Sequence, residues 1–515
     1  MRRHRPLLLL PLLSGLYGCP ATPPAADQFA DAATTQGDLG TLAQDLAGSD
    51  TPAPSDGPTQ DGSSPDAPAQ DGSGADAPAQ DSTSSDTATA PKLCSTGLEL
   101  FTKEVDNGGD EAAHALLATA DGGALLLGGN GNGGSSSNAL AVRLSPLGGV
   151  VWTKELGGAE MDRFRGGATA GSGFVAVGST RSPTNGLDDG WLVHLDSGGK
   201  ASAQQHYGGA SNDQFFGIAP TVGGWVVAGS TRSLGNGQEE GWVVRTTADG
   251  QQLWEQHYGG SSVDTLAAVI ALPNGNFAAV GENSSSAKQG SDAWLLIVNG
   301  NGNLLISKTY HSGEHDLATA VAVLPDGGLV LTGEASVNGN PELWVLRTDA
   351  EGNQLWKDVV PGNQAETGRG VAVLTDGGWA VAGESSSSIA GSLGGIDAWL
   401  LRYDAWGNRL WDKHFGGSGN EWFSGVAALP DGGLWLAGRR FAPGGLNAWF
   451  LRVNAWGHST CATAGVCKDK AAGDCQDQLP CTVDRCDPME GCSHPALPIG
   501  STCGAGNTCA PGGCQ

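Results

Sequence analysis

One segment recurs seven times along the middle of the chain, and this repeat limits the possible folds more than any other feature. The segment reads DGG, then four or five residues, then glycine, and its copies begin 50 to 55 residues apart. Its first positions are Asp121, Gly171, Val222, Asn274, Asp326, Asp376 and Asp431. A second position, two residues after an acid or amide, keeps the same period at Leu140, Trp191, Trp242, Trp294, Trp344, Trp399 and Trp449. Repeats of this length indicate solenoids, propellers or arrays.

Each unit contains four short runs with strand character and no helical period. One unit reads TAVAVLPDGG, LVLTGEA, ELWVLRTDAEG and NQLWKDVV, with DG turns at the tight ends. Four strands per unit are typical of a propeller blade, and a closed ring of blades leaves no long exposed sheet edge. A stacked β-solenoid is the alternative, but its coils are shorter. The sequence therefore predicts an all-β, seven-bladed β-propeller.

The phase of the repeat predicts how the ring closes. Residues 100–121 align without a gap on residues 410–431, so the chain enters the ring with the last strand of a blade. Six complete units and a final partial one follow. We expect residues 98–105 to complete the sheet that is left unfinished after Asn454.

Units such as GGSGNEWFSGVAALPDGG followed by DAWFLRVNAWG resemble those of bacterial β-propeller repeat lipoproteins. The resemblance covers about residues 98–457 and implies a propeller behind a lipid anchor. The elements DAEGNQLW and DAWGNRLW also look like the tryptophan-docking motif of pyrroloquinoline-quinone dehydrogenase propellers. From this resemblance we infer only a packing role: Asp and Gly shape a hairpin turn, and Trp fills the seam between blades.

The first residues of the chain predict export. Arg2, Arg3 and Arg5 precede an apolar run of about ten residues, which is half of the ~20 that a membrane-spanning helix needs. The run ends in Leu16-Tyr17-Gly18-Cys19, which resembles the lipobox of bacterial lipoproteins. The resemblance implies lipidation of Cys19, a membrane partner reached through the lipid, and a place in the outer membrane or at the cell surface.

Composition then divides the chain into four parts. Residues 1–18 are the predicted signal peptide. Residues 19–93, rich in Ala, Pro, Asp, Ser and Gly, cannot build a core and are predicted to be a disordered linker. Residues 94–460 are the predicted propeller, and residues 461–515 form a cysteine-rich module that resembles those of myxobacterial surface proteins.

Ten cysteines remain besides Cys19, and the exported context favours disulfides over free thiols. They are Cys94, Cys461, Cys467, Cys475, Cys481, Cys486, Cys492, Cys503, Cys509 and Cys514. The tail holds an odd number, nine, so complete pairing needs Cys94, and we expect it to pair with Cys461. A zinc site is the alternative, but the gaps in CQDQLPCTVDRCDPMEGC are not those of CxxC ligand pairs.

Seven acids share one repeat position, before the first strand of each unit. They are Glu111, Asp162, Asp213, Asp264, Asp316, Glu366 and Glu421. A ring of carboxylates could bind a hard cation such as calcium. We favour a structural role, because a short acid at a loop-to-strand junction commonly accepts backbone N–H bonds. No metal or other cofactor is otherwise expected.

Variable connections on one face of the ring point to binding. The segments RSPTNGLDDG, RSLGNGQEEG, NSSSAKQGSD and SSSSIAGSLGGID differ in length and content, and binding residues favour loops on a rigid scaffold. Four arginines, placed at the start of such loops, are candidate contacts for an anionic ligand: Arg181, Arg232, Arg439 and Arg440. Charge balance against nearby acids is the alternative.

No familiar catalytic motif supports an enzyme. The sequence His311–His315 matches HxxEH, but it contains Ser and Gly and falls in a predicted loop, so we treat the match as accidental. His206, His257 and His414 share a rim position and are expected to be solvated. A net charge of −27 disfavours nucleic-acid binding. We therefore expect a non-enzymatic binding or adhesion scaffold with a protein or glycan partner; the alternative is a carbohydrate-active or other hydrolytic extracellular enzyme.

Overall fold

The computed structural model describes residues 101–105, 110–131, 136–182, 187–235, 237–285, 290–387, 393–442 and 445–459, together with four short strands in the tail. Every regular element within these residues is a β-strand. This described part has no helix long and apolar enough to cross a bilayer.

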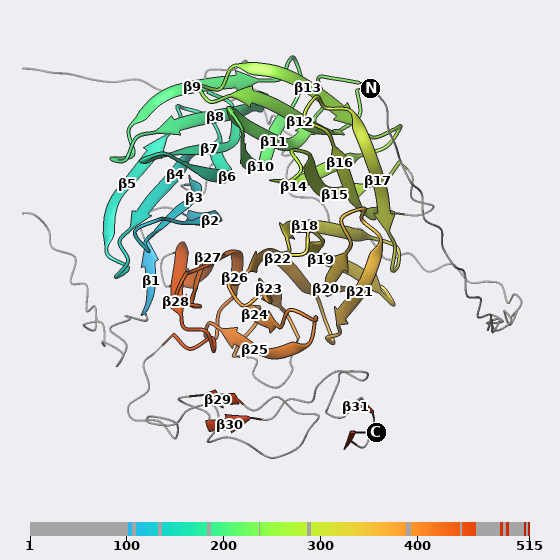
Figure 1. Ribbon diagram of the computed structural model, residues 1–515. Helices are drawn as coiled ribbons and strands as arrows, with labels where there is room; N and C mark the ends of the chain where they lie inside the picture. Colours follow the sequence, from blue (N-terminus) through green and yellow to red (C-terminus); the bar gives the residue numbers. More distant parts are fainter. Residues whose placement is uncertain are drawn as a thin grey trace, which may run out of the picture. The chain divides into compact units, whose positions relative to one another are not determined.

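Seven four-stranded antiparallel sheets make up the described ring, and we call them blades 1 to 7 (Figure 1). Blade 1 is β2 (Asp110–Ala118), β3 (Ala124–Gly131), β4 (Ser137–Leu144) and β5 (Val150–Leu156). Blade 2 is β6 (Asp162–Ala170), β7 (Gly173–Thr180), β8 (Asp189–Leu195) and β9 (Ala201–Tyr207). Blade 3 is β10 (Asp213–Thr221), β11 (Gly224–Thr231), β12 (Glu240–Thr247) and β13 (Gln252–Tyr258).

The other four blades repeat this order. Blade 4 is β14 (Asp264–Ala271), β15 (Phe277–Asn283), β16 (Asp292–Val298) and β17 (Leu304–Tyr310). Blade 5 is β18 (Asp316–Val323), β19 (Leu329–Val337), β20 (Asn340–Thr348) and β21 (Gln354–Val360). Blade 6 is β22 (Glu366–Val373), β23 (Trp379–Ser385), β24 (Asp397–Tyr403) and β25 (Arg409–Phe415). Blade 7 is β26 (Glu421–Ala428), β27 (Leu434–Ala442), β28 (Gly445–Val453) and β1 (Phe101–Val105).

The first strand of each blade is the innermost one, and these strands meet around the central space (Figure 1). β2 contacts β6, and the contacts continue through β10, β14, β18 and β22 to β26, which contacts β2 again. The predicted seven-bladed propeller is thus confirmed. The four tail strands form two small hairpins, β29 (Arg485–Asp487) with β30 (Gly491–Ser493), and β31 (Cys509–Ala510) with β32 (Gly513–Cys514).

The ring closes with the strand that the repeat phase predicts. β1 pairs antiparallel with β28, with Thr102 opposite Leu451 and Glu104 opposite Trp449. Side chains add to this pairing, since Trp449 Nε1 donates to Thr102 Oγ1 at 2.8 Å. Asn447 Nδ2 donates to Glu104 at 2.9 Å. Two ends of the ring more than 300 residues apart in sequence therefore share one sheet.

The predicted DG turns join the first and second strands of the blades. In blade 5, the Gly327 N–H donates to the Leu324 carbonyl at 2.9 Å, and Asp326 Oδ1 accepts from the Gly328 N–H at 2.9 Å. Gly327 has a φ of 85°, a left-handed conformation that favours glycine. The sequence DGG thus supplies an acceptor for the turn and a residue that can adopt its backbone conformation.

Tryptophans of the fourth strands fill the seams between blades, as the docking element predicts. Trp152 of blade 1 donates from Nε1 to the Ser197 carbonyl of blade 2 at 3.0 Å, and Trp254 of blade 3 donates to the Gly300 carbonyl of blade 4 at 2.9 Å. The turn glycine beside the first ring, Gly199, has no room for a side chain: a Cβ there would lie 2.8 Å from Trp152. Each ring is therefore covered by a glycine of the next blade.

Candidate functional site

The two faces of the ring differ in regularity. The DG turns and the turns between third and fourth strands lie on one face, which we call the turn face. The connections between second and third strands lie on the other, which we call the variable face, and these range from a tight turn in blade 5 to the long segment before β24. Because the turn face repeats and the variable face does not, ligand selectivity is expected on the variable face.

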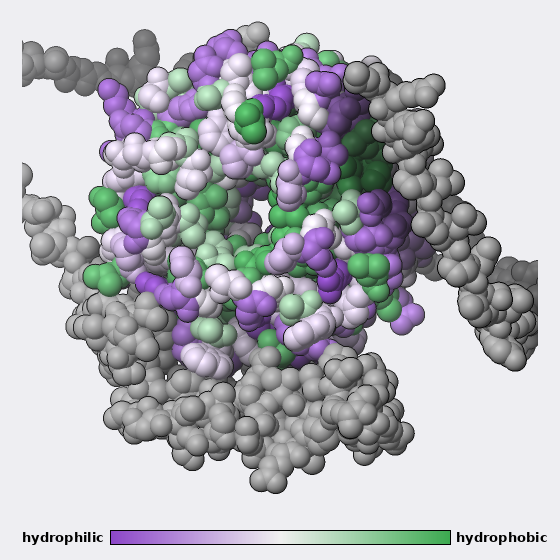
Figure 2. Space-filling view, in the orientation of Figure 1, coloured by the Kyte–Doolittle hydropathy of each residue, from purple (hydrophilic) through white to green (hydrophobic). Residues whose placement is uncertain are grey.

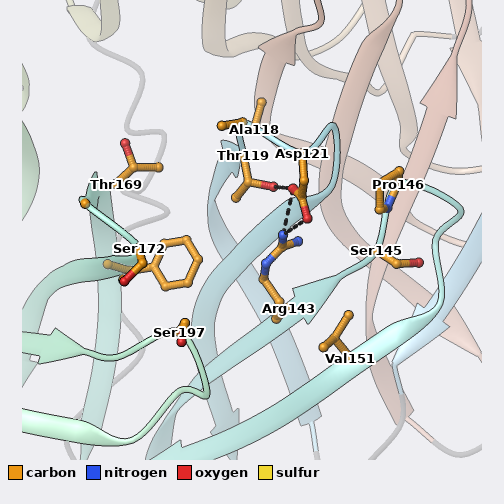
Figure 3. A pocket seen from close by; sticks show the side chains of 14 residues that line it. Ala118, Thr119, Asp121, Arg143, Ser145, Pro146, Val151, Thr169, Ser172 and Ser197 are labelled. Atoms are coloured by element: carbon orange, nitrogen blue, oxygen red, sulfur yellow. Dashed lines mark hydrogen bonds and ion pairs between the residues drawn. The ribbon is translucent and has the colours of Figure 1, made fainter.

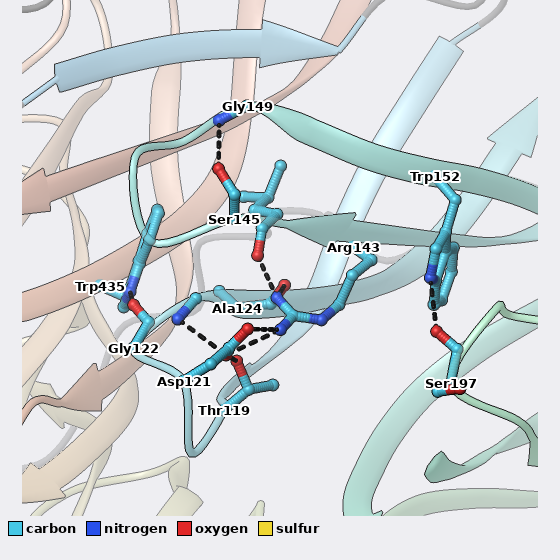
Figure 4. A network of polar contacts seen from close by, with 12 residues as sticks. Thr119, Asp121, Gly122, Ala124, Arg143, Ser145, Gly149, Trp152, Ser197 and Trp435 are labelled. Carbon is cyan, nitrogen blue, oxygen red and sulfur yellow. Dashed lines mark hydrogen bonds and ion pairs between the residues drawn. The ribbon is translucent and has the colours of Figure 1, made fainter. Parts of the chain in front are cut away.

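A pocket of about 530 Å³ does open on the turn face, between blades 1 and 2. It is walled by residues such as Asp121, Arg143 and Pro146 of blade 1 and Thr169 and Ser172 of blade 2 (Figure 3). Arg143 donates from Nη2 to Asp121 at 2.6 Å, and the Gly123 N–H donates to the same carboxylate at 3.2 Å (Figure 4).

The polar wall of this pocket belongs to a repeated structural device. The ion pair between a third-strand arginine and the DG-turn aspartate recurs as Arg347–Asp326 at 2.6 Å, Arg402–Asp376 at 2.5 Å and Arg452–Asp431 at 2.7 Å. In blade 1, a hydrogen bond from Thr119, followed by Arg143, lowers the pKa of Asp121. Because the same pair appears in four blades, we assign it to turn stability rather than to recognition.

The seven repeated acids are buried, with at most 1% of each residue exposed. The sequence analysis placed these acids before the first strand of each unit. In the structure they belong to the strand: six are its first residue, and Glu111 is the second residue of β2. Asp213 accepts from the Gly209 N–H at 2.9 Å and from Ser233 Oγ at 2.6 Å. Asp264 accepts the equivalent bonds from Gly260 and Ser285 at 2.8 and 2.6 Å.

These contacts pin the variable loops to the strand ends, which is the structural role favoured above. Asp162, Asp316 and Glu421 accept N–H bonds of the same kind, from Gly158, Ser312 and Gly417. Glu366 departs from the pattern, because burial and the neighbouring carboxyl of Glu342 raise its pKa to about 7. Burial beside Glu342 therefore favours the protonated form of Glu366.

Two of the four candidate arginines lie on the variable face and are paired with acids. Arg181 Nε is 2.7 Å from Asp188, and Arg232 Nη2 is 2.9 Å from Glu239. Their charges are therefore balanced within their own loops, which is the alternative that the sequence left open.

The other two candidates, Arg439 and Arg440, lie within β27 and not at the start of a loop. The reason is that the hairpin of β27 and β28 stays paired up to Ala442 opposite Gly445. Arg440 is 3.0 Å from Glu104 and 3.6 Å from Glu421. Arg439 makes no ion pair within the described residues, and its guanidinium lies 4.8 Å from the ring centre of Trp422.

Arg439 belongs to a larger group of side chains at the end of the channel that faces the variable loops, which we call the channel mouth. Three repeat positions form it. The first and the third lie one and three residues after the repeated acid, where side chains alternate with the buried ones. The second lies opposite the first on the paired strand, so both side chains are on the same face of the sheet. The first position holds Ala112, Arg163, Gln214, Thr265, Leu317, Thr367 and Trp422. The residues opposite these are Gly129, Ser179, Ser230, Glu282, Glu334, Glu384 and Arg439. The third position holds His114, Arg165, Phe216, Ala267, Thr319, Arg369 and Ser424.

The third position is a β-bulge in every blade. The register shifts between Phe164 and Gly166, for example, so that Arg165 is the extra residue. Bulges redirect side chains and are frequent beside functional sites. The space-filling view shows that an opening remains at the centre of the ring (Figure 2).

Charge is divided unevenly around the channel mouth. The basic side holds Arg439 of blade 7, His114 of blade 1, and Arg163 and Arg165 of blade 2. Burial, followed by repulsion from Arg163 and Arg439, lowers the pKa of Arg165 to about 10. Burial and then Arg369 lower the pKa of Arg439 to about 10.

The acidic side comes from blades 4 to 6. Burial raises the pKa of Glu282 and of Glu334. Glu384 is 2.6 Å from Arg369 and neutralises that arginine. Within the described residues, the channel mouth thus has guanidinium groups without ion-pair partners on one side and carboxyls with raised pKa values on the other.

One further cluster contains a residue of the HxxEH sequence. Asp292, His311 and Asp316 place one potential ligand atom each within 4.8 Å of one another. His311 Nδ1 is 2.8 Å from Asp292, while Asp316 Oδ2 accepts from the Ser312 N–H at 2.6 Å. The segment is a connection between β17 and β18 without a helix, so the peptidase geometry is missing. His311 and Asp292 pair with each other, whereas the buried Oδ1 of Asp316 has no hydrogen-bond partner among the described residues.

The three rim histidines have different surroundings. His206 is exposed, and His257 Nδ1 contacts Glu240 at 2.5 Å. His414 instead stacks on Trp399 with ring centres 5.3 Å apart, and neither of its buried ring nitrogens has a hydrogen-bond partner. Burial lowers its pKa, so the expectation of a solvated side chain is wrong for His414.

The predicted lipidation and disulfide sites fall almost entirely outside the described residues. Cys19, Cys94 and the tail cysteines Cys461, Cys467, Cys475, Cys481 and Cys503 are in this group. The backbone of the tail hairpins places Cys486 opposite Cys492 and Cys509 opposite Cys514. The disulfide connectivity stays a prediction.

Comparison with known proteins adds only distant structural likeness. No family model matches the chain, and no curated protein matches it. It is similar to the Neurospora crassa Pan2 WD40 domain at 11% identity, with 67% of this chain and 96% of that one covered and a TM-score of 0.38. It is also similar to Chaetomium thermophilum Sqt1 at 13% identity, 69% and 98% coverage and a TM-score of 0.40. The extracellular domain of a putative one component system from B. thetaiotaomicron has 8% identity, 68% and 39% coverage and a TM-score of 0.37. The propeller assignment rests on the sheet topology above.

Sequence reasoning identified Arg439 but missed its neighbours. Arg163 and Arg165 lie inside a first strand, where the alternating pattern of the repeat hides them. The available signal was the alignment of units. At the first and third channel positions, charged side chains replace the uncharged residues of other blades. A charge that appears in only some copies of a repeat is not needed for the fold.

Proposed function

We propose that the protein is an exported, lipid-anchored binding protein whose propeller presents the channel mouth and the variable face to a ligand. The lipobox-like Leu16–Cys19 and the linker-like residues 19–93 support an anchor and a spacer. Two acyl chains or more anchor a protein durably without a spanning helix. The linker would carry the ring away from the lipid surface.

The observation that carries the binding role is the difference between repeated and unrepeated charges. Turn-face arginines pair with the DG-turn aspartates, and Arg181 and Arg232 pair with acids of their own loops. At the channel mouth, Arg165 and Arg439 form no ion pair with any described residue, in a chain with a net charge of −27. Cations kept without a partner in an acidic protein favour an anionic ligand.

Binding without turnover tests this proposal. The full chain would be applied to arrays of glycans and of peptides, and any bound compound would be incubated with the protein and analysed by mass spectrometry. A ligand recovered unchanged supports a binding protein. No ligand on either array would contradict the proposal.

A hydrolytic enzyme is the second candidate, and one observation favours it. Glu282 and Glu334, partly buried on the acidic side of the channel mouth, have raised pKa values, as proton-donating carboxyls of glycosidases do. Cleavage of a bound glycan that disappears in Glu334→Gln would establish this function in place of the first.

The anchor has its own test. Mass spectrometry of the mature N-terminus should find a lipidated Cys19, and Cys19→Ser should release the protein from membranes. Antibody labelling of intact cells would then show whether the propeller is exposed at the cell surface. A Cys19→Ser variant that stays in the membrane fraction would refute the lipid anchor.

A further inference from the structure

Two arginines at the channel mouth have buried nitrogen atoms that nothing in the described residues satisfies. The Nε atoms of Arg165 and Arg439 are inaccessible to solvent and have no hydrogen-bond acceptor. Both guanidinium groups lie near aromatic rings: Arg165 lies 5.9 Å from the ring centre of Phe216, and Arg439 lies 4.8 Å from that of Trp422. Both side chains are partly exposed, and each keeps one buried N–H without an acceptor, which lowers stability.

The blade between these two arginines has small residues at the channel mouth. Blade 1 separates Arg439 on blade 7 from Arg165 on blade 2. Its residues at the channel mouth are Ala112 and, opposite it, Gly129. No other blade has so small a pair at these positions, since the other pairs each include Arg, Gln, Thr, Leu or Trp.

The third position of blade 1, His114, holds an imidazole rather than another charge. Burial, followed by repulsion from Arg165 and Arg439, lowers the pKa of His114 well below its usual value. The ring is therefore neutral at pH 7, and it offers one donor and one acceptor between the guanidinium groups. Cationic groups from blades 7 and 2 thus lie on either side of a neutral hydrogen-bonding ring of blade 1.

We infer that the basic side of the channel mouth binds the carboxylate of an acidic sugar between Arg165 and Arg439. This inference rests on the proposed binding function and names its ligand. Guanidinium groups recognise carboxylates through paired N–H donors, and removal from water strengthens such bonds. The faces of Trp422 and Phe216, beside the two arginines, can pack against the apolar face of a sugar ring.

The acidic side of the same mouth selects the body of the ligand. Glu282 and Glu334 face the channel from blades 4 and 5. Carboxyls there repel a densely charged polyanion such as nucleic acid, but they accept hydrogen bonds from hydroxyl groups. A sugar with one carboxylate and several hydroxyls matches both sides.

Isothermal titration calorimetry on the full chain tests the inference with trigalacturonate, neutral trigalactose and inorganic sulfate as probes. We expect trigalacturonate to bind most tightly. Arg165→Met and Arg439→Met should each weaken its binding at least about tenfold, because each removes charge-assisted hydrogen bonds of about 1.5 kcal/mol or more. Arg181→Met and Arg232→Met, whose arginines are already paired with acids, are the matched controls and should bind normally.

Unfolding temperatures separate recognition from folding. Since Arg165 and Arg439 lack partners, their Met variants should melt at or above the wild-type temperature, whereas a structural arginine would lower it. Equal affinity for trigalactose and trigalacturonate, or unchanged binding in both Met variants, would overturn the inference. Binding of sulfate as tight as that of trigalacturonate would also overturn it, in favour of a simple anion site. If the protein binds another ligand through the variable loops, the proposed function stands and this inference alone fails.

Discussion

The carboxyl pair of Glu366 and Glu342 should make the stability of the propeller depend on pH in a way that one substitution removes. Glu366 begins β22 and is fully buried, and Ser387 Oγ donates to its Oε1. Its Oε2 has no donor, while Glu342 Oε2 already accepts from the Gly362 N–H at 2.7 Å. One proton shared by the two carboxyls therefore removes both a charge repulsion and an unsatisfied oxygen.

The sign of the effect follows from proton binding. Burial and then Glu342 raise the pKa of Glu366 from 4.5 to about 7, so the folded protein holds a proton that the unfolded chain has lost. This contribution to stability is complete below pH 4.5 and disappears as the pH rises through 7. Each pKa unit corresponds to about 1.4 kcal/mol, so the loss is roughly 3 kcal/mol.

Glu366→Gln should abolish this dependence, because an amide stays neutral and can donate to Glu342. Urea unfolding followed by Trp fluorescence at pH 5 and pH 8 measures it. We expect the variant to gain up to roughly 3 kcal/mol over the wild type at pH 8 and much less at pH 5. Asp213→Asn is the control: it loses bonds from Gly209 and Ser233 and should be destabilised at both pH values. Equal destabilisation of Glu366→Gln at both pH values would refute the shared proton.

Three further predictions concern the ring. Gly199→Ala should destabilise the protein by more than about 1 kcal/mol, because its Cβ would meet Trp152; Gly275→Ala, also at positive φ but with open space, measures the backbone strain alone in the same thermal unfolding experiment. Ala335→Thr should raise stability by about 1 kcal/mol, because its hydroxyl could donate to Asp316 Oδ1, which lacks a partner. Thr180 and Thr231, at the same repeat position, donate to the acids of their blades, and an unchanged melting temperature would contradict the prediction. Cys94 should be disulfide-bonded to Cys461, contributing on the order of 5 kcal/mol as an upper figure by closing a loop of 367 residues; non-reducing peptide mapping that recovers a free Cys94 would contradict the bond.

The fold could be predicted because the strand and turn pattern of one blade occurs seven times in the sequence. The spacing of DGG and Trp fixed the number of blades, and the alignment of residues 100–121 with 410–431 predicted the strand that closes the ring. The seam role of Trp152 followed from the docking element. Each of these features depends on backbone pairing and on large apolar side chains, which leave a periodic signal in the sequence.

The channel mouth could not be predicted in the same way, because its side chains come from single positions in different blades. Arg165 and Arg439 are 274 positions apart in the sequence, and only the closed ring brings both to one mouth. The pairing of Arg181 with Asp188 was visible as a possibility in the sequence, since both lie in one loop. The position of Arg440 beside Glu104 needed the closing strand β1.

The repeat itself separates structural polar groups from those that the fold does not require. A side chain that stabilises a blade is expected in every blade, as the acids that begin the first strands are, and five of these acids accept N–H bonds from the preceding loop. A departure from the repeat that keeps the same hydrogen bond, such as Ser385 in place of a threonine opposite the acid, is a local adjustment. Departures that leave buried groups without partners, as at Arg165 and Arg439, lower stability and yet are present. A cation that costs stability and has no counterpart in most of the other blades is explained by what it binds, which is why the ligand is sought at the channel mouth.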